Sequence, residues 1–264
     1  LKLRRIKMKN KALHLESDEF TQRSATEAEI DASLRKYVDQ LLPVMGGRAW
    51  NWDIQVTLKR QVFSRLIHYY ELYKKIVDVQ GVILEFGVQW GATLTTLNNL
   101  RGMFEPYNHA RKIYGFDTFE GFATIDEKDG GFSKVGQYEV SEDYEKVLED
   151  ILNLHQGLSP IPQIKKFELI KGDASVTFPK WLDDNTHAIV AMAILDMDVY
   201  KATKDVLEKI IPRLTKGSLL VFDELNYQHF PGETQAVAEV LGLNNLALRC
   251  FPDQPYCSWA IWEG

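Results

Sequence analysis

The chain has 264 residues, 45% of them hydrophobic, and a net charge of −6 that results from 31 basic and 37 acidic residues. This length fits one α/β domain with additional elements, and the hydrophobic content is ordinary for a globular protein with a full core. The acidic balance gives no indication of a nucleic-acid partner, and no apolar run is long enough to cross a bilayer. The two cysteines, Cys250 and Cys257, are too few for a disulfide framework or a zinc site. We therefore expect a cytoplasmic protein with neither a nucleic-acid nor a membrane partner.

The N-terminal part of the chain is predicted to be a helical extension of the main domain. Residues 1 to about 50 are charged and irregular, with one helical stretch at about 25–42. Residues 57–77 carry aromatic and aliphatic side chains at helical spacing, which predicts a helix packed on the main domain. We expect residues 1–78 to form the extension and residues 79–264 to form one domain. Because the first fifty residues have too little apolar periodicity for a core of their own, we expect them to dock on a second subunit of a homo-oligomer.

A glycine-containing turn follows the first predicted strand of the main domain. Residues 81–86 form an apolar run that leads into Gly87 and Gly91, after which a helix is predicted to begin. Glycines at such a turn let the backbone approach a ligand closely. The three-glycine dinucleotide fingerprint is absent, and Gln89 and Trp90 crowd the place where a pyrophosphate would lie. The turn therefore favours a nucleoside without phosphates over NAD.

The next segments extend this ligand-binding half. A second strand is predicted at 112–116 and ends at Asp117, where a carboxylate can bridge the two hydroxyls of a ribose. Residues 119–141 are rich in glycine and acidic residues without a period, which predicts a long loop or lid. An amphipathic helix at 142–154 and a third strand at 167–170 follow, and the third strand leads to Asp173.

Acidic residues follow two further apolar runs, at 188–194 and 218–221. Asp196 and Asp198 come after the first run, Asp223 and Glu224 come after the second, and a helical segment separates the runs. A right-handed crossover places the ends of both strands at the same edge of a sheet, where open α/β sheets bind ligands. Carboxylates at such a place repel each other unless a cation or a proton joins them, and Mg²⁺ is a natural partner for oxygen ligands. The alternative for a single residue is that Asp198 caps the following helix.

The end of the chain is predicted to complete the sheet. A helix is predicted at 234–241, with Glu233 near its N-terminus, where a carboxylate is favourable. Residues 246–250 and 258–262 have the composition of two closing strands.

Five motifs in this order resemble the class I S-adenosylmethionine-dependent methyltransferases. They are similar above all to the macrocin (TylF/MycF-type) O-methyltransferases, which act on sugars of antibiotics and related natural products. The motifs lie at 83–91, 114–121, 171–173, 196–200 and 223–224. The resemblance implies an α/β, Rossmann-like fold with a mostly parallel seven-stranded sheet in the order 3-2-1-4-5-7-6, flanked by helices, with the last strand antiparallel.

The resemblance also implies roles for individual residues. Glu85 and Gly87 would line the methionine part of S-adenosylmethionine, Asp117 would hold its ribose, and Asp173 and Ala174 would contact its adenine. The complete set implied for cofactor binding is Glu85, Gly87, Gly91, Asp117, Thr118, Asp173, Ala174 and Asp196. Asp196, Asp223 and Glu224 would hold Mg²⁺, and Asp198 would be the general base.

Together these observations predict an S-adenosylmethionine- and Mg²⁺-dependent O-methyltransferase that acts on a small-molecule hydroxyl, and the family points to a sugar. His229 is a second candidate for a base or a substrate contact, although a histidine in a loop is more often a solvated surface residue. Two other interpretations stay open at this point. One is an enzyme similar to cephalosporin hydroxylases on the same fold, and the other is a non-catalytic binding protein.

Overall fold

The computed structural model describes residues 25–45 and 53–264. Residues 68–264 belong to one compact unit, and the described residues before 68 belong to a second. The second unit contains α1 (Ala25–Leu41), η1 (Ile54–Thr57) and the first turns of α3 (Arg60–Ile76). The helices predicted at about 25–42 and at 57–77 are confirmed as α1 and α3. The predicted domain limits of 1–78 and 79–264 stay a prediction.

The larger unit is built on a seven-stranded sheet in the order β3-β2-β1-β4-β5-β7-β6. Its strands are β1 (Val82–Phe86), β2 (Ile113–Asp117), β3 (Phe167–Lys171), β4 (Val190–Leu195), β5 (Leu214–Phe222), β6 (Arg249–Phe251) and β7 (Gln254–Ile261). The first five strands pair in parallel, whereas β7 pairs antiparallel with both β5 and β6. The predicted fold class, strand order and antiparallel last strand are confirmed.

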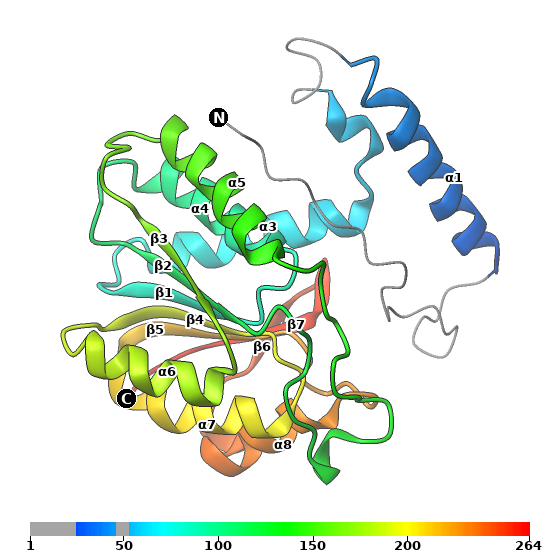
Figure 1. Ribbon diagram of the computed structural model, residues 1–264. Helices are drawn as coiled ribbons and strands as arrows, with labels where there is room; N and C mark the ends of the chain where they lie inside the picture. The colour runs from blue at the N-terminus through cyan, green and yellow to red at the C-terminus, as the bar shows by residue number, and fades with distance from the viewer. Residues whose placement is uncertain (1–24, 46–52) are drawn as a thin grey trace. The chain divides into compact units, whose positions relative to one another are not determined.

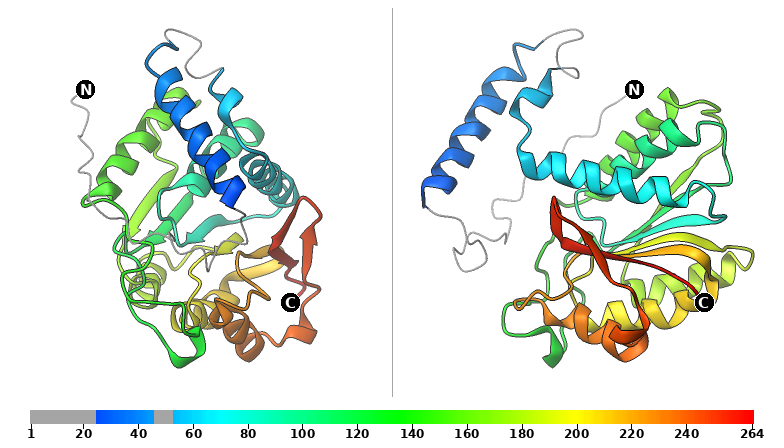
Figure 2. Two further views of the ribbon diagram at one scale, coloured as in Figure 1. Left: turned by 90° about the vertical axis from the view of Figure 1, so that its right-hand side faces the viewer. Right: turned by 180° about the vertical axis from the view of Figure 1, so that it is seen from behind.

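Helices cover both faces of the sheet and make a three-layer arrangement (Figure 1). The end of α3 lies on one face with α4 (Ala92–Phe104) and α5 (Tyr144–Leu158), and the opposite face carries α6 (Ala174–Asp184), α7 (Tyr200–Ile210) and α8 (Pro231–Val240) (Figure 2). Short 3-10 turns are η2 (Glu127–Asp129), η3 (Ile211–Arg213) and η4 (Leu243–Asn245). Every residue of β4 is buried, because this central strand has a helical layer on each side. The sequence did not predict α6, which contains Pro179.

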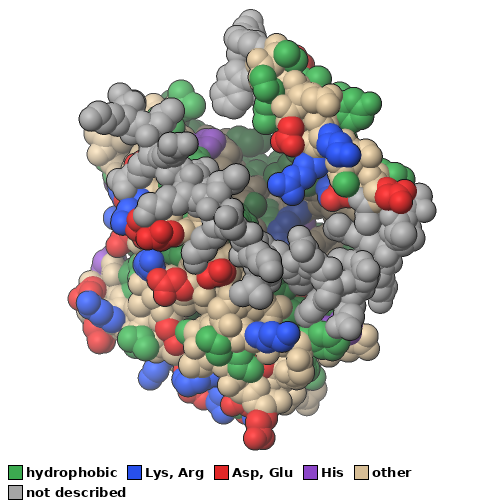
Figure 3. Space-filling model, turned by 45° about the vertical axis from the view of Figure 1, so that its right-hand side comes forward, with side chains coloured by type: hydrophobic (Ala, Val, Ile, Leu, Met, Phe, Trp, Pro, Cys, Tyr) green, Lys and Arg blue, Asp and Glu red, His purple; other side chains and the backbone are tan. Residues whose placement is uncertain are grey.

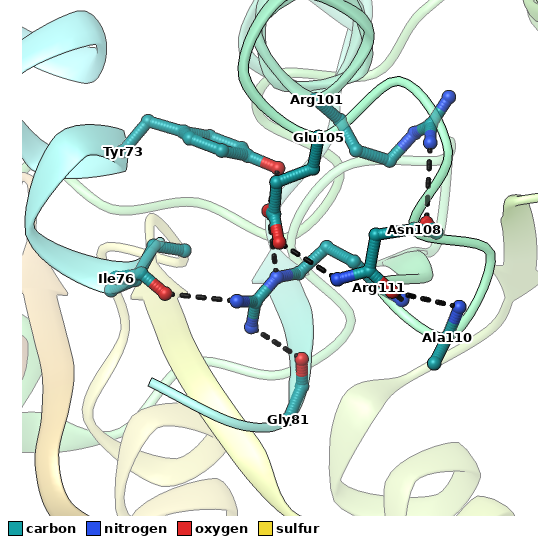
Figure 4. A network of polar contacts seen from close by, with 8 residues as sticks. All are labelled: Tyr73, Ile76, Gly81, Arg101, Glu105, Asn108, Ala110 and Arg111. Atoms are coloured by element: carbon teal, nitrogen blue, oxygen red, sulfur yellow. Dashed lines mark hydrogen bonds and ion pairs between the residues drawn. The ribbon is translucent and has the colours of Figure 1, made fainter. Parts of the chain in front are cut away.

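A buried polar network fixes the end of α3 to the start of the sheet (Figure 4). Arg111 Nε donates to Glu105 Oε2 at 2.9 Å, and Tyr73 Oη donates to the same oxygen at 2.7 Å. The two terminal nitrogens of Arg111 donate to the carbonyls of Gly81 and Ile76 at 2.6 and 2.8 Å. Because each charge in this buried pair has several hydrogen bonds, removing either partner alone is expected to destabilise the fold by about 3–5 kcal/mol.

Acidic and basic side chains lie interspersed on the face of the molecule that Figure 3 draws. Within residues 25–45 and 53–264, no helix combines the length and the apolar character needed to span a membrane.

Candidate active site

The parallel register brings the ends of the central strands to one edge of the sheet. Phe86 is paired with Leu195, and Leu195 is paired with Phe222, so β1, β4 and β5 end side by side. Asp196 follows β4 and its amide donates to the Phe86 carbonyl at 2.8 Å, and the amide of Asp223 donates to the Leu195 carbonyl at 3.1 Å. The acidic residues after β4 and β5 are therefore at the same edge as the glycine turn after β1, as the crossover rule predicted.

Gly87 is required by the close approach of two strand ends. Its φ of +93° lies in the region that L side chains rarely adopt, and a Cβ there would lie 1.7 Å from the carbonyl oxygen of Asp196. The turn ends at Gly91, with a φ of +79°, where α4 begins. Both glycines thus permit the tight backbone path at the start of the predicted cofactor site.

Asp117, at the end of β2, organises this turn with its side chain. Asp117 Oδ2 accepts hydrogen bonds from the amides of Val88 and Gln89 at 2.6 and 2.7 Å, and Oδ1 accepts one from Phe119 at 2.5 Å. Burial raises the pKa of this carboxyl, and the three amides partly offset that effect. The carboxylate is held rigidly at the place where the resemblance puts a ribose, and that role stays a prediction.

The other residues predicted to contact the cofactor have local partners. Asp173 caps α6, because its Oδ1 accepts from the Ser175 amide at 2.8 Å, and Ala174 is the buried first residue of that helix. Thr118 Oγ1 donates to the Gly121 carbonyl at 2.6 Å and so shapes the beginning of the 119–141 loop. Glu85 is buried inside β1 with 1% of its surface exposed.

Glu233 is the residue of this edge that the sequence did not assign to the site. It does lie in the first turn of α8, as predicted, but its side chain is fully buried. Neither of its carboxylate oxygens has a hydrogen-bond partner among the residues that the structure describes. Burial raises its pKa well above the usual value, and the negative charges of four nearby carboxylates raise it further. These five residues, Asp196, Asp198, Asp223, Glu224 and Glu233, are called the acidic cluster below.

Asp198 is held in a strained backbone conformation. Its φ is +62°, and the amide of Val199 donates to the carbonyl of Met197 at 2.6 Å, which closes a tight γ-turn around Asp198. A left-handed conformation costs an ordinary residue roughly 1–2 kcal/mol and is kept where the surroundings fix it, often at functional sites. The alternative that Asp198 caps the next helix is not what the structure shows. The amide of Tyr200, at the start of α7, donates instead to Asp129 at 2.5 Å.

Two further side chains adjoin the acidic cluster. The thiol of the buried Cys257, on β7, donates to Asp223 Oδ1 at 2.8 Å. Burial raises the pKa of the Tyr138 hydroxyl, and the charges of Asp198, Glu224 and Asp196 raise it further. Tyr138 belongs to the 119–141 loop, so this loop reaches the cluster as a covering segment would.

Aromatic rings from two loops meet beside the cluster. Tyr138 contacts Phe122 and Phe230 with ring centroids 5.3 and 6.1 Å apart, and Phe230 contacts Tyr227 at 6.0 Å. His229 contacts Phe132 at 4.4 Å and is half-buried, so it lies among these loops rather than on an open surface. Its role as a base stays a prediction.

The donor set at this edge fits a hard cation in its chemistry. It consists of carboxylates only, and one of them is buried without a hydrogen-bond partner among the described residues. As placed, however, no three His, Cys, Asp or Glu side chains within residues 25–45 and 53–264 are grouped closely enough to hold one metal ion.

A sheet of this order, with a glycine turn after β1 and carboxylates after β4 and β5, places the protein in the class I methyltransferase fold. A family model described as macrocin O-methyltransferase matches residues 63–247, and the chain belongs to this family. This confirms the resemblance found in the sequence.

Three known proteins illustrate the relationship. A crystal structure of a calicheamicin methyltransferase, CalS11, is 33% identical, covers 97% of this chain and 100% of its own, and has a TM-score of 0.85. The O-methyltransferase NovP, at 18% identity over 76% of this chain and 80% of its own, has a TM-score of 0.59 and shares the fold. A rhamnosyl-tetracenomycin C 4′-O-methyltransferase from Streptomyces olivaceus is 27% identical over an alignment of 158 residues that covers 55% of this chain. The chain spans about half of that relative, 53% of its length.

Proposed function

We propose that this protein transfers the methyl group of S-adenosylmethionine to a hydroxyl of a sugar or sugar nucleotide in natural-product biosynthesis. The observation that carries the proposal is the contact between the Gly87 turn and Asp196, which joins the predicted nucleoside site to the acidic cluster. The names of relatives support the acceptor class. One structure of CalS11, 34% identical over 93% of this chain with a TM-score of 0.81, is described as a TDP-rhamnose 3′-O-methyltransferase.

The cofactor half of the site fits S-adenosylmethionine, whose sulfonium supplies an activated methyl group. Gly87 and Gly91 adopt the positive φ angles of this tight turn, and Asp117 fixes the amides of Val88 and Gln89 within it. We propose that Glu85, Thr118, Asp173 and Ala174 complete this half. The three-glycine pattern that a pyrophosphate needs is absent from the sequence, which favours this cofactor over NAD.

The acceptor half requires a base, because an alcohol is a poor nucleophile at neutral pH. We assign this role to Asp198, whose carboxylate accepts the proton as the hydroxyl oxygen attacks the methyl carbon and the sulfur leaves with the bonding electron pair. The strained γ-turn fixes the backbone at Asp198, and holding a catalytic group in place lowers the entropic part of the barrier. The rings of Tyr138 and Phe230 would cover the acceptor and exclude water.

The carboxylate donors suit a divalent cation such as Mg²⁺ in their chemistry, and Asp196, Asp223 and Glu224 would hold it if their side chains moved closer together than the structure places them. There it would supply Lewis-acid chemistry, which lowers the pKa of a ligated hydroxyl. Cys257 keeps Asp223 oriented through its thiol, and the raised pKa of the buried Glu233 favours its uncharged form beside these carboxylates.

Replacing Asp196 by Asn is expected to weaken activity and to let added Mg²⁺ restore part of it, because the variant loses one charged ligand. The measurement is the initial rate of methyl transfer over a Mg²⁺ titration, with wild-type protein and Asp205→Asn, an exposed-face change on α7, as controls. A variant with the same Mg²⁺ dependence as the wild type would contradict the ligand assignment.

The proposed function is tested by binding and by transfer. We expect S-adenosylhomocysteine, but not NAD, to raise the melting temperature, and we expect nucleotide-linked deoxysugars to gain one methyl group by mass spectrometry. Binding of S-adenosylhomocysteine without transfer to any hydroxyl acceptor would favour one of the two other interpretations of the sequence.

We also propose that the protein is a homo-oligomer. The described part of the smaller unit exposes several large apolar side chains, such as Ile30 and Tyr37 on α1, at 62% and 60%. A second copy would cover such residues. Light scattering well above micromolar concentration is expected to give a mass of at least two chains, and a mass near 30.4 kDa would contradict the proposal.

A further inference from the structure

The 119–141 loop is fastened to the acidic half of the fold by one buried carboxylate. Asp129, the last residue of η2, is fully buried, although it belongs to a loop. Its Oδ1 accepts from the amide of Tyr200 at 2.5 Å, and its Oδ2 accepts from the amide of Asp126 at 2.7 Å. Asp129 thus supplies the N-terminal cap of α7 from 71 positions away in the sequence.

The first turn of α8 closes over this contact. A Cβ at Gly232 would lie 2.0 Å from Asp129 Oδ1 and 2.6 Å from the amide nitrogen of Tyr200. Only a residue without a side chain lets α8 begin here while Asp129 caps α7. The loop, α7 and α8 therefore meet at Asp129. In Figure 1 the short green helix of the loop, η2, lies beside α8.

Contacts of Lys128 on the surface also connect the loop with α7 and α8. Lys128 Nζ lies 3.9 Å from the centre of the Tyr200 ring and 2.5 Å from Glu239 Oε1, and Gln235 donates to the Lys128 carbonyl at 3.2 Å. Exposed ion pairs of this kind contribute little. A buried carboxylate with two amide donors is costly to remove, because both amides then lose their acceptor. Asp129, rather than Lys128, is the contact that holds the loop.

Each of the three elements that meet at Asp129 carries a residue that belongs to the acidic cluster or lies next to it. The γ-turn at Asp198 ends directly before Tyr200, Glu233 directly follows Gly232, and Tyr138 lies on the fastened loop. We propose that Asp129 is a positioning residue for methyl transfer, which fixes Asp198, Glu233 and the covering loop in one arrangement. This inference rests on the proposed function for its kinetic part.

The test compares Asp129→Ala with Asp129→Asn, which keeps one oxygen for the Tyr200 amide. We expect kcat per folded molecule to fall by about 10–100-fold in the Ala variant, the scale of a small misplacement of a reacting group. The Asn variant is expected to stay within a few-fold of the wild type. Affinity for S-adenosylhomocysteine should be unchanged in both, because Asp117 and the Gly87 turn lie outside this contact. Lys128→Ala is the matched control, since it removes the neighbouring surface contacts and leaves Asp129 in place.

A substitution on α8 disturbs the contact between Asp129 and the Tyr200 amide without changing Asp129 itself. Gly232→Ala inserts a methyl group against Asp129 and is expected to lower kcat as Asp129→Ala does, with the double variant no worse than either alone. If Asp129→Ala does not fold, Gly232→Ala and Asp129→Asn decide the question. Wild-type kcat in folded Gly232→Ala, or equal losses in Lys128→Ala and Asp129→Ala, would overturn the proposal.

Hydrogen exchange separates this inference from the proposed function. In Asp129→Ala, the Tyr200 amide and residues 122–137 are expected to exchange faster together, whereas Lys128→Ala should leave both protected. This result needs no acceptor, so it decides the contact even if the wild-type protein methylates none of the sugars offered. Unchanged exchange at Tyr200 in Asp129→Ala would refute the cap.

Discussion

Replacing Asp198 by Asn is expected to lower kcat by about 10²–10⁴-fold, the usual cost of losing a general base. The change is nearly isosteric, so the γ-turn between Met197 and Val199 should persist. Affinity for S-adenosylhomocysteine should barely change, because the methyl donor is assigned to the turn after β1. Since the metal ligands remain, added Mg²⁺ should not restore the rate.

Asp198→Asn and Asp196→Asn are expected to differ in how their rates depend on Mg²⁺. Single-turnover rates at several Mg²⁺ concentrations should separate the two variants, with partial rescue for Asp196→Asn only. Excess chelator is expected to abolish turnover of the wild type. Full activity in the presence of EDTA would remove the metal from the mechanism and leave Asp198 as a base acting alone. Wild-type kcat in Asp198→Asn would mean that another group, with His229 the first candidate, accepts the proton.

Replacing Gly87 by Ala is expected to produce the largest loss of stability among single changes in the turn. The added methyl group would lie 1.7 Å from the Asp196 carbonyl oxygen, at a φ of +93°. Overpacking and the unfavourable φ together are expected to cost roughly 2–5 kcal/mol. The strands must separate at their ends to accept the methyl group, so both the cofactor turn and the acidic cluster would be disturbed.

Urea denaturation of Gly87→Ala, with Gly157→Ala as the control, measures this effect. Gly157 lies on the exposed side of α5. A Cβ at this position would have no atom of the described residues within 4 Å. Alanine at that helical position should be neutral or stabilising. Equal midpoints for the two variants would show that the approach of Gly87 to Asp196 is not a tight constraint.

Local patterns were sufficient to predict most of the individual strands and helices, whereas the order of the strands came from the resemblance to a known family. The apolar runs at 188–194 and 218–221 became β4 and β5, because buried parallel strands need apolar side chains on both faces. The acidic edge followed from the crossover rule applied to those two strands. The helix α6 was not predicted, because Pro179 lies inside it and proline usually marks the end of a helix in a sequence.

The contacts that complete the site could not be predicted, because they join residues far apart in the chain. Asp129 caps a helix that begins at Tyr200, and Cys257 donates to Asp223 across neighbouring antiparallel strands. Glu233 was correctly placed in the first turn of α8, but helical position alone does not tell which way a side chain faces in the folded protein. Asp117 was identified because it ends a predicted strand. The three hydrogen bonds that its carboxylate accepts from backbone amides depend on the path of two loops and could not be predicted.

The meeting of Asp129, Tyr200 and Gly232 also sets a rule for redesigning acceptor preference. Residues 119–141 are an obvious segment to exchange with a relative, since we propose that they cover the acceptor. A grafted loop without a side-chain oxygen acceptor at position 129 would leave the Tyr200 amide buried and unpaired, and a host with a larger residue at position 232 could not receive Asp129. Loop, helix start and glycine therefore form one transferable unit, and chimeras should be cut around all three.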